Sequence, residues 1–97
     1  MIFCNHEEMI VQGPITIDNV AAMTQQGKTF FDRPLRVVDL QQITQVDSSV
    51  ISMMLEWLRA ARLQGCQIRF VNLSPNLESL IQLYGVEELI PTVELSH

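Results

Sequence analysis

The sequence has few of the residues that mark a metal site, a disulfide framework or a nucleic-acid surface. It holds two cysteines and two histidines in 97 residues, and Cys4 and Cys66 show no CxxC or CxxH spacing. This pattern favours two reduced thiols and provides no zinc ligand set. Six lysine and arginine residues stand against eleven acidic ones, whereas binding a phosphate backbone needs a basic surface. We therefore expect no metal, no cofactor and no nucleic-acid partner.

Long apolar runs are also missing. No stretch reaches the ~18 consecutive apolar residues that a membrane-spanning helix needs, and the start, Met1 to His6, lacks the basic and apolar segments of a secretory signal. We therefore expect a cytoplasmic protein without direct membrane insertion. At 47% hydrophobic residues, the chain is expected to form one domain, 1–97, around a single modest core.

Motifs for catalysis are absent as well. There is no GxxxxGK[ST] loop to hold nucleotide phosphates, and no nucleophile stands with its base in a recognisable motif. Asp39 and Asp47 flank the central loop, but neither has a histidine or lysine beside it. The sequence therefore predicts a protein that is not an enzyme.

The central part of the chain holds the clearest structural pattern. Val37, Val38 and Leu40 form an apolar run that is typical of a strand buried on both faces, and we expect this strand to span 35–40. A short loop and an amphipathic helix that ends before Gly65 are expected to follow. A buried strand followed by a helix is the core of an α/β unit.

Three residues with short, oxygen-bearing side chains precede that helix. Asp47, Ser48 and Ser49 are candidate caps, because such side chains satisfy the unpaired N–H groups of a first helical turn. For Asp47, a capping role and a role in a switch site both remain open. A phosphate on Ser48 would lie at the positive end of the helix dipole and would be stabilised there.

The other elements are predicted from apolar periodicity and from turn residues. They are strands at 2–4, 9–11 and 67–71, helices at 17–27 and 75–84, and a final short strand or loose tail at 92–95. Thr16 is the expected cap of the first helix, and Ser74 followed by Pro75 is a strong start for the last one. This order contains a βαβ crossover and predicts the α/β class.

The long helix can be divided into two sides at 100° per residue. The side expected to face the core carries Val50, Ile51, Met54, Leu55, Trp57, Leu58 and Ala61. The other side is less charged than an ordinary solvated face, so it is either a docking surface of moderate polarity or plain surface. The candidate partner-binding residues there and in the preceding loop are Asp47, Ser48, Ser49, Ser52, Met53, Glu56 and Arg59.

The Asp47-Ser48-Ser49 segment and the helix after it resemble the signature of the STAS domain family, to which the anti-sigma-factor antagonists belong. This resemblance implies a STAS fold, with a mixed central sheet of four to five strands packed with three to four helices. Ser48 matches the position of the phosphoacceptor in the antagonists. The antagonists usually have glycine where this chain has Val50, a β-branched residue that stiffens the start of the helix.

Three further segments, 55–61, 69–75 and 83–91, are similar to a narrower branch of the family, the MlaB type. That resemblance implies a non-catalytic accessory subunit that binds and regulates the ATPase of a phospholipid ABC transporter, which maintains outer-membrane lipid asymmetry. Such a subunit would lie at the inner membrane through the ATPase and, indirectly, the permease. The alternative is an anti-sigma-factor antagonist that is switched by phosphorylation of Ser48.

Overall fold

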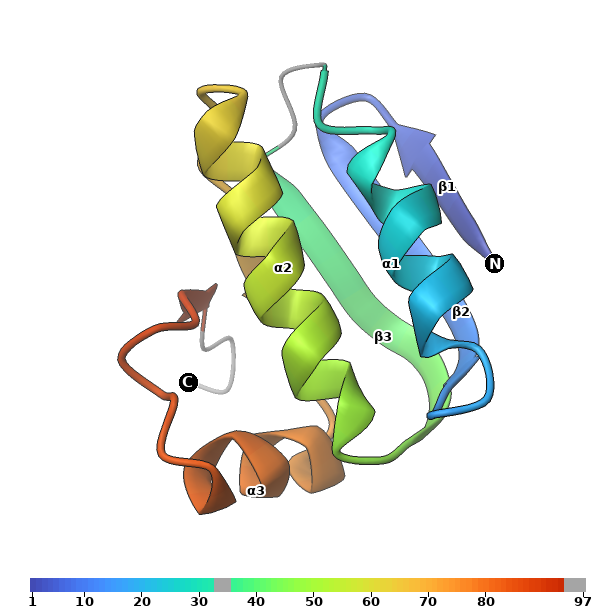
Figure 1. Ribbon diagram of the computed structural model, residues 1–97, viewed down its shortest axis with the longest axis vertical. Helices are drawn as coiled ribbons and strands as arrows, with labels where there is room; N and C mark the ends of the chain where they lie inside the picture. Colours follow the sequence, from blue (N-terminus) through green and yellow to red (C-terminus); the bar gives the residue numbers. More distant parts are fainter. Residues whose placement is uncertain (33–35, 94–97) are drawn as a thin grey trace.

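The computed structural model describes residues 1–32 and 36–93, which form a mixed five-stranded sheet packed with helices (Figure 1). In chain order the elements are β1 (Ile2–Asn5), β2 (Glu8–Ile15), α1 (Val20–Lys28), β3 (Val37–Val46), α2 (Ser49–Leu63), β4 (Arg69–Val71), α3 (Pro75–Leu83) and β5 (Thr92–Val93). The strands lie in the order β1-β2-β3-β4-β5; β1 is antiparallel to β2 and the other neighbours are parallel. The predicted α/β class, with a mixed sheet, is confirmed.

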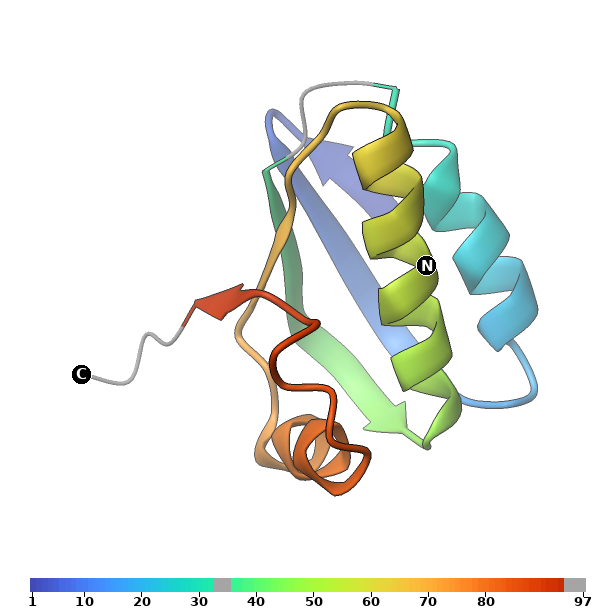
Figure 2. The same cartoon turned by 60° about the vertical axis from the view of Figure 1, so that its left-hand side comes forward.

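The helices are unevenly distributed around the sheet. α1 and α2 lie side by side on one face, and α3 lies beside the N-terminal end of α2 (Figures 1 and 2). The parallel pairs β2–β3 and β3–β4 are each joined through a helix, as parallel strands require. Within the described residues, the opposite face of the sheet carries no helix.

The core lies between the sheet and the two helices on that face. Trp57 of α2 is fully buried at its centre, and its indole Nε1 donates a hydrogen bond to the carbonyl oxygen of Thr24 in α1, at 3.0 Å. Phe31 meets the Trp57 ring edge-on, with ring centroids 6.4 Å apart. Gly27 of α1 lies directly against the same ring, where it has no room for a side chain. Close packing of α1 on α2 therefore depends on Gly27.

The first helix begins later than predicted. α1 starts at Val20, after Asn19, and not at Ile17 with Thr16 as its cap. The N–H of Ile17 donates to the Asp47 carboxylate, at 2.9 Å, which ties Ile17 to the loop before α2. The Asn19 side chain also holds the turn, since its Oδ1 accepts from the N–H of Thr16 and its Nδ2 donates to the carbonyl of Pro14. These contacts with sequence neighbours and with a distant loop override the local capping signal.

The central strand is longer than predicted. β3 continues to Val46, where a loop was expected after Leu40, because its second half pairs with Gln12 to Ile15 of β2. Leu35, the expected first residue of the strand, lies outside the described residues. The extension brings β3 level with the C-terminal end of β2, where Val46 pairs with Ile15. Asp47 therefore lies next to the turn between β2 and α1.

The last helix matches its prediction closely. α3 begins at Pro75, and the Oγ of Ser74 accepts a hydrogen bond from the N–H of Leu77, at 3.1 Å. Its buried residues are Leu77 and Ile81, while Tyr84, the last residue of the predicted helix, is 50% exposed. α3 therefore ends with an aromatic side chain on the surface beside the start of α2.

Candidate functional site

Asp47 organises the loop between β3 and α2. One carboxylate oxygen accepts from both the backbone N–H and the hydroxyl of Ser49, and the other accepts from the N–H of Ile17. The hydrogen bond from the Ser49 hydroxyl, followed by that from Ile17, lowers the pKa of Asp47 below its usual value. Asp47 thus caps α2 and ties it to the turn between β2 and α1. The predicted capping role is confirmed for Asp47, whereas Ser48 occupies the N-cap position without a side-chain cap bond.

The Ser48 hydroxyl is free for an external partner. Its side chain is exposed and makes no hydrogen bond within residues 1–32 and 36–93, whereas the Ser49 hydroxyl is taken up by Asp47. Ser52 is also exposed, one helical turn further along α2. Both hydroxyls lie in the first turns of a helix, where the positive end of the helix dipole favours an approaching hydrogen-bond acceptor.

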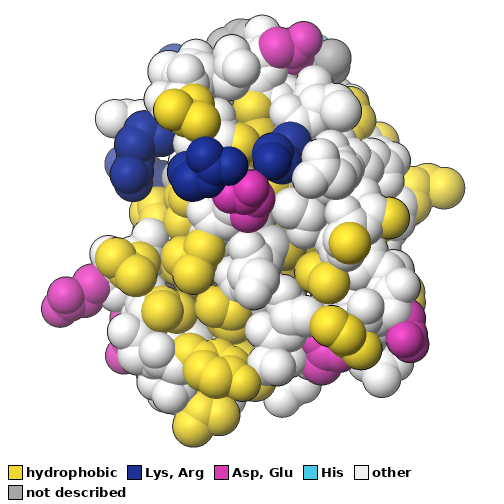
Figure 3. All heavy atoms as spheres, in the orientation of Figure 1, with side chains coloured by type: hydrophobic (Ala, Val, Ile, Leu, Met, Phe, Trp, Pro, Cys, Tyr) yellow, Lys and Arg dark blue, Asp and Glu magenta, His cyan; other side chains and the backbone are white. Residues whose placement is uncertain are grey.

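A hollow of about 700 Å³ opens beside these serines. Its lining consists of Ile17, Asp47, Ser48, Ser49, Ile51, Ser52 and Tyr84. Ile17 is 74% exposed and Tyr84 is 50% exposed, so large apolar side chains project on two sides of the free hydroxyls. In Figure 3, apolar side chains gather in the lower half of the helical face, over α3 and the start of α2. Hydroxyl groups flanked by exposed apolar groups are typical of a protein-docking surface.

Sequence analysis missed Ile17 and Tyr84, two of the apolar residues that line this hollow. Both were assigned to helices, at 17–27 and 75–84, because both fit an apolar periodicity. Each lies in a different part of the chain from Ser48, and only the fold brings the three together. A usable signal was present nonetheless, since Ile17 follows Gly13-Pro14 and Tyr84 precedes Gly85, where turns are expected.

Met53 does not belong to the exposed surface. It was predicted as a partner-binding residue, but its side chain is fully buried. Ala60, which was not among the residues expected to face the core, is also buried, whereas Leu55 and Leu58 on the predicted core side are only half-buried. α1 packs along the flank of α2 that was assigned to solvent, as the ion pair between Lys28 of α1 and Glu56 shows. The buried stripe is therefore turned toward α1 relative to the prediction.

Glu56 and Arg59 form an ion cluster that also involves α1. Both oxygens of Glu56 accept from Arg59, at 2.6 and 2.9 Å, and one also accepts from Lys28 Nζ at 3.1 Å. Hydrogen bonds from Arg59 and then from Lys28 lower the pKa of Glu56 to about 2. Figure 3 shows the basic side chains as a band across the helical face with an acidic group at its edge. The cluster links the two helices and presents Arg59, the more exposed partner, to solvent.

Replacing Glu56 with glutamine is expected to remove part of the pH dependence of stability. The pKa of Glu56 is about 2 in the folded state, against 4.5 for the unperturbed group. The contribution of Glu56 to the free energy of unfolding is therefore complete above pH 4.5 and is lost as the pH falls toward 2. We expect the wild type to melt at a higher temperature than Glu56→Gln at pH 7, and this margin to shrink through that window.

Thermal melts of both proteins between neutral pH and pH 2 measure this effect. Glu88→Gln is the control, since Glu88 is exposed and forms no ion pair within the described residues. If the difference in melting temperature between the wild type and Glu56→Gln stays constant or widens down to pH 2, the pH-dependent stabilisation does not come from Glu56.

No metal-binding group of three or more histidine, cysteine, aspartate or glutamate side chains occurs in the described ranges. None of the described helices is both long and apolar enough to cross a membrane. Of the predicted site residues, the structure brings Asp47, Ser48, Ser49 and Ser52 together around the hollow. Glu56 and Arg59 lie further along α2, in the ion cluster.

Solved structures with a similar fold include two that are described as anti-sigma-factor antagonists and a variant of RsbS. The antagonist SpoIIAA in its unphosphorylated form superposes with a TM-score of 0.70 at 15% identity, over 98% of this chain and 88% of that one. An anti-sigma-factor antagonist (STAS) domain protein from Planctomyces limnophilus gives 0.71 at 13% identity, over 95% and 86%. A variant of RsbS from Moorella thermoacetica gives 0.67 at 18% identity, over 96% and 84%. At these identities the likeness establishes the STAS fold and not a shared activity.

Among curated proteins, none matches the sequence significantly. The family model described as MlaB, STAS domain, matches residues 5–91, which include every described helix and the hollow beside Ser48. The match spans far more than half of the chain and agrees with the fold seen in the solved structures. The chain therefore belongs to the MlaB-type STAS domain family.

Proposed function

We propose that this protein is a non-catalytic accessory subunit that binds and regulates the ATPase of a phospholipid ABC transporter. In this role it would lie at the inner membrane through the ATPase and, indirectly, the permease. The observation that carries the proposal is the hollow beside Ser48, where free hydroxyls are flanked by exposed apolar side chains. A surface of this kind suits a protein partner, and the match to the MlaB type favours the transporter ATPase as that partner.

Binding at this surface can regulate the ATPase without any chemistry in this chain. The Asp47 hydrogen bonds hold the start of α2 against the turn before α1, so these two segments form a rigid platform. A rigid platform that fits one conformation of the ATPase better than another shifts the ATPase toward that conformation. The size of the shift equals the difference between the two binding free energies.

The second candidate is an anti-sigma-factor antagonist, and one observation favours it. The Ser48 hydroxyl is exposed and free of hydrogen bonds in the described part of the chain, so a serine kinase can reach it. A phosphate there would add about two negative charges at the rim of the hollow and would abolish docking of an apolar partner surface. The two candidate functions use the same surface and differ in the partner and in the modification.

Affinity purification of the tagged protein from its native cells separates the two candidates. Stoichiometric recovery of an ABC ATPase with its permease supports the transporter role. Recovery of a serine kinase or an anti-sigma factor, with phosphate on Ser48, supports the antagonist role and contradicts the proposal. Mass spectrometry of the purified protein reads out both the partners and the modification.

Ser48→Glu is expected to weaken partner binding at least about tenfold, because it places an unpaired charge in a desolvated interface. Ser48→Ala is expected to have a smaller effect, since it removes one hydroxyl and adds no charge. Titration of the purified partner against each variant measures the dissociation constants.

Ser79→Glu is the matched control for this experiment, since Ser79 is also exposed but lies on α3 outside the residues that line the hollow. We expect it to bind the partner as the wild type does. Equal affinity of the wild type and Ser48→Glu would remove Ser48 from the interface.

A further inference from the structure

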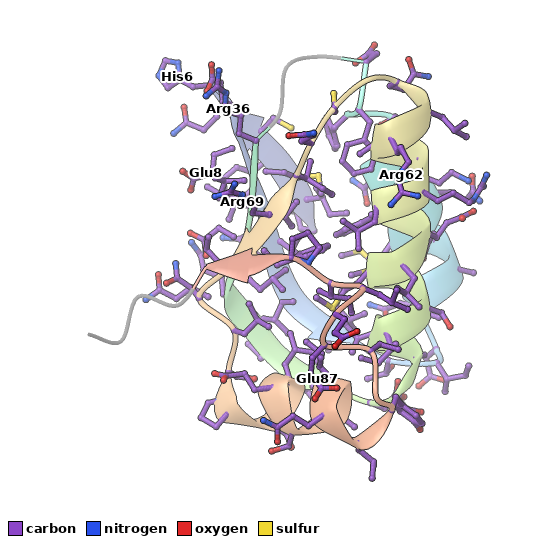
Figure 4. The ribbon with its side chains drawn as sticks, turned by 90° about the vertical axis from the view of Figure 1, so that its left-hand side faces the viewer. His6, Glu8, Arg36, Arg62, Arg69 and Glu87 are labelled. Carbon is purple, nitrogen blue, oxygen red and sulfur yellow. The ribbon has the colours of Figure 1, made fainter. Side chains whose placement is uncertain are left out.

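One face of the sheet is left open by the part of the chain that the structure describes. α1 and α2 cover the other face, and Figures 2 and 4 show no helix over the far side. Water still reaches apolar side chains on the open face: Phe3 is 38% exposed, and Ile10, Val37 and Val71 are half-buried. An open sheet face with this apolar content is a candidate interaction surface.

Strand pairing arranges the side chains of this face in two rows. The first row, across β1 to β4, is Asn5, Glu8, Val37 and Arg69. The second row, across the same strands, is Phe3, Ile10, Asp39 and Val71. Because neighbouring strands lie about 4.8 Å apart, Glu8 and Arg69 flank Val37 at equal distances on opposite sides.

The two charges that flank Val37 have opposite signs and are both unpaired. Neither Glu8 nor Arg69 forms an ion pair within residues 1–32 and 36–93. Figure 4 shows both on the side of the sheet away from α2. The nearby Glu7 and Arg36 already pair with each other, at 3.1 Å. The open face therefore presents one negative and one positive group in a symmetric arrangement about β3.

We propose that two copies of this chain associate through their open sheet faces, about a two-fold axis that runs along β3 over Val37. This rotation exchanges the two sides of each row, so that Glu8 meets the partner's Arg69 and Arg69 meets the partner's Glu8. In the second row Ile10 meets the partner's Val71. The face is thus complementary to itself, as a two-fold interface requires, and sheets pack face to face in this aligned way.

The size of the face sets the strength of the dimer. Five strands about 4.8 Å apart, with rows about 6.6 Å apart along each strand, offer less than the ~800 Å² per partner of a standard interface. We therefore expect a weak dimer, with a dissociation constant in the micromolar range. Each α2 faces outward in this arrangement, so the dimer leaves both Ser48 surfaces open and can hold two partner molecules at once.

Asp39 is the unfavourable element of the interface. It lies on the axis in the second row and faces the partner's Asp39, which places two like charges together. Its Oδ1 accepts from Asn72 Nδ2 at 3.1 Å and from the Gln41 N–H at 2.9 Å. Asparagine keeps this acceptor oxygen and removes the charge. Asp39→Asn is therefore expected to tighten the dimer several-fold without disturbing the fold.

Sedimentation velocity of the full chain, from low to high micromolar concentration, tests the proposal. Glu8→Arg and Arg69→Glu are each expected to raise the dimer dissociation constant about tenfold or more, because like charges then meet. An equimolar mixture of these two variants is expected to associate as well as the wild type. In the mixture one copy presents two positive groups and the other two negative groups, so both pairs form again.

Three results would overturn the proposal. These are a wild type that stays monomeric over the whole range, single variants that dimerise like the wild type, and a mixture that stays monomeric. Thermal melts of each variant confirm that the fold is kept. The outcome is independent of the proposed docking function, because none of these residues lines the hollow beside Ser48.

Discussion

Gly27→Ala is expected to destabilise the domain by about 3 kcal/mol, the upper part of the range for overpacking a core. A Cβ at this position would lie 2.3 to 2.5 Å from three atoms of the Trp57 indole. The ring has no room to move away, because it is fully buried and its Nε1 is held by Thr24. α1 would have to separate from α2. Urea unfolding of the two proteins measures the loss.

A double-mutant cycle with Trp57→Phe checks that the clash is the cause. Phenylalanine lacks the part of the indole that the new Cβ would meet, namely Nε1, Cε2 and Cζ2. Trp57→Phe is itself expected to be destabilising, but Gly27→Ala should cost much less in that background than in the wild type. An equal cost in both backgrounds would mean that the loss arises elsewhere, for example in the backbone of α1.

Ile17→Asp is expected to weaken partner binding about thirtyfold, or about 2 kcal/mol, without changing the stability of the fold. The side chain of Ile17 is 74% exposed and lines the hollow beside Ser48, so it has few contacts within the domain to lose. In a complex it would be covered by the partner, and a carboxylate there would be desolvated without a counter-ion. Titration against the ATPase and a thermal melt give the two readouts.

Leu63→Asp provides a matched control for that variant. Leu63 is 73% exposed, almost the same as Ile17, but it is the last residue of α2, at the opposite end from Ser48. It is expected to leave partner binding unchanged. If the two variants weaken binding equally, the cause is the added negative charge on the protein and not its place in the hollow. If neither weakens it, the partner docks elsewhere.

Local signals predicted much of the secondary structure. The Ser74-Pro75 start of α3 was confirmed because a side-chain cap and a residue with a fixed φ act within one turn of chain. The strands predicted at 2–4 and 9–11 were confirmed for a similar reason, and the short polar turn between these two apolar runs joins them as an antiparallel pair. The left-handed φ of 59° at His6 lies in this turn.

The phase of α2 could be predicted only in part. Sequence periodicity shows that a helix has an apolar stripe, but the centre of that stripe depends on which neighbours pack against it. Met53 and Ala60 are buried because α1 lies along their flank of α2, whereas Leu55 is only half-buried. A helix that touches one neighbouring helix and a sheet buries a wider and differently centred stripe than a symmetric wheel predicts.

By itself, the sequence determined the α/β class, the capped start of α3, the Asp47-Ser48-Ser49 loop and the resemblance to the STAS family, because each depends on residues close together in the chain. Tertiary structure alone decided the length of β3, the burial of Met53 and the hollow where Ile17 and Tyr84 meet Ser48. It also decided that Glu8 and Arg69 flank Val37 on an open face. These features depend on contacts between segments far apart in sequence, whose free energy outweighs the local preferences of either segment.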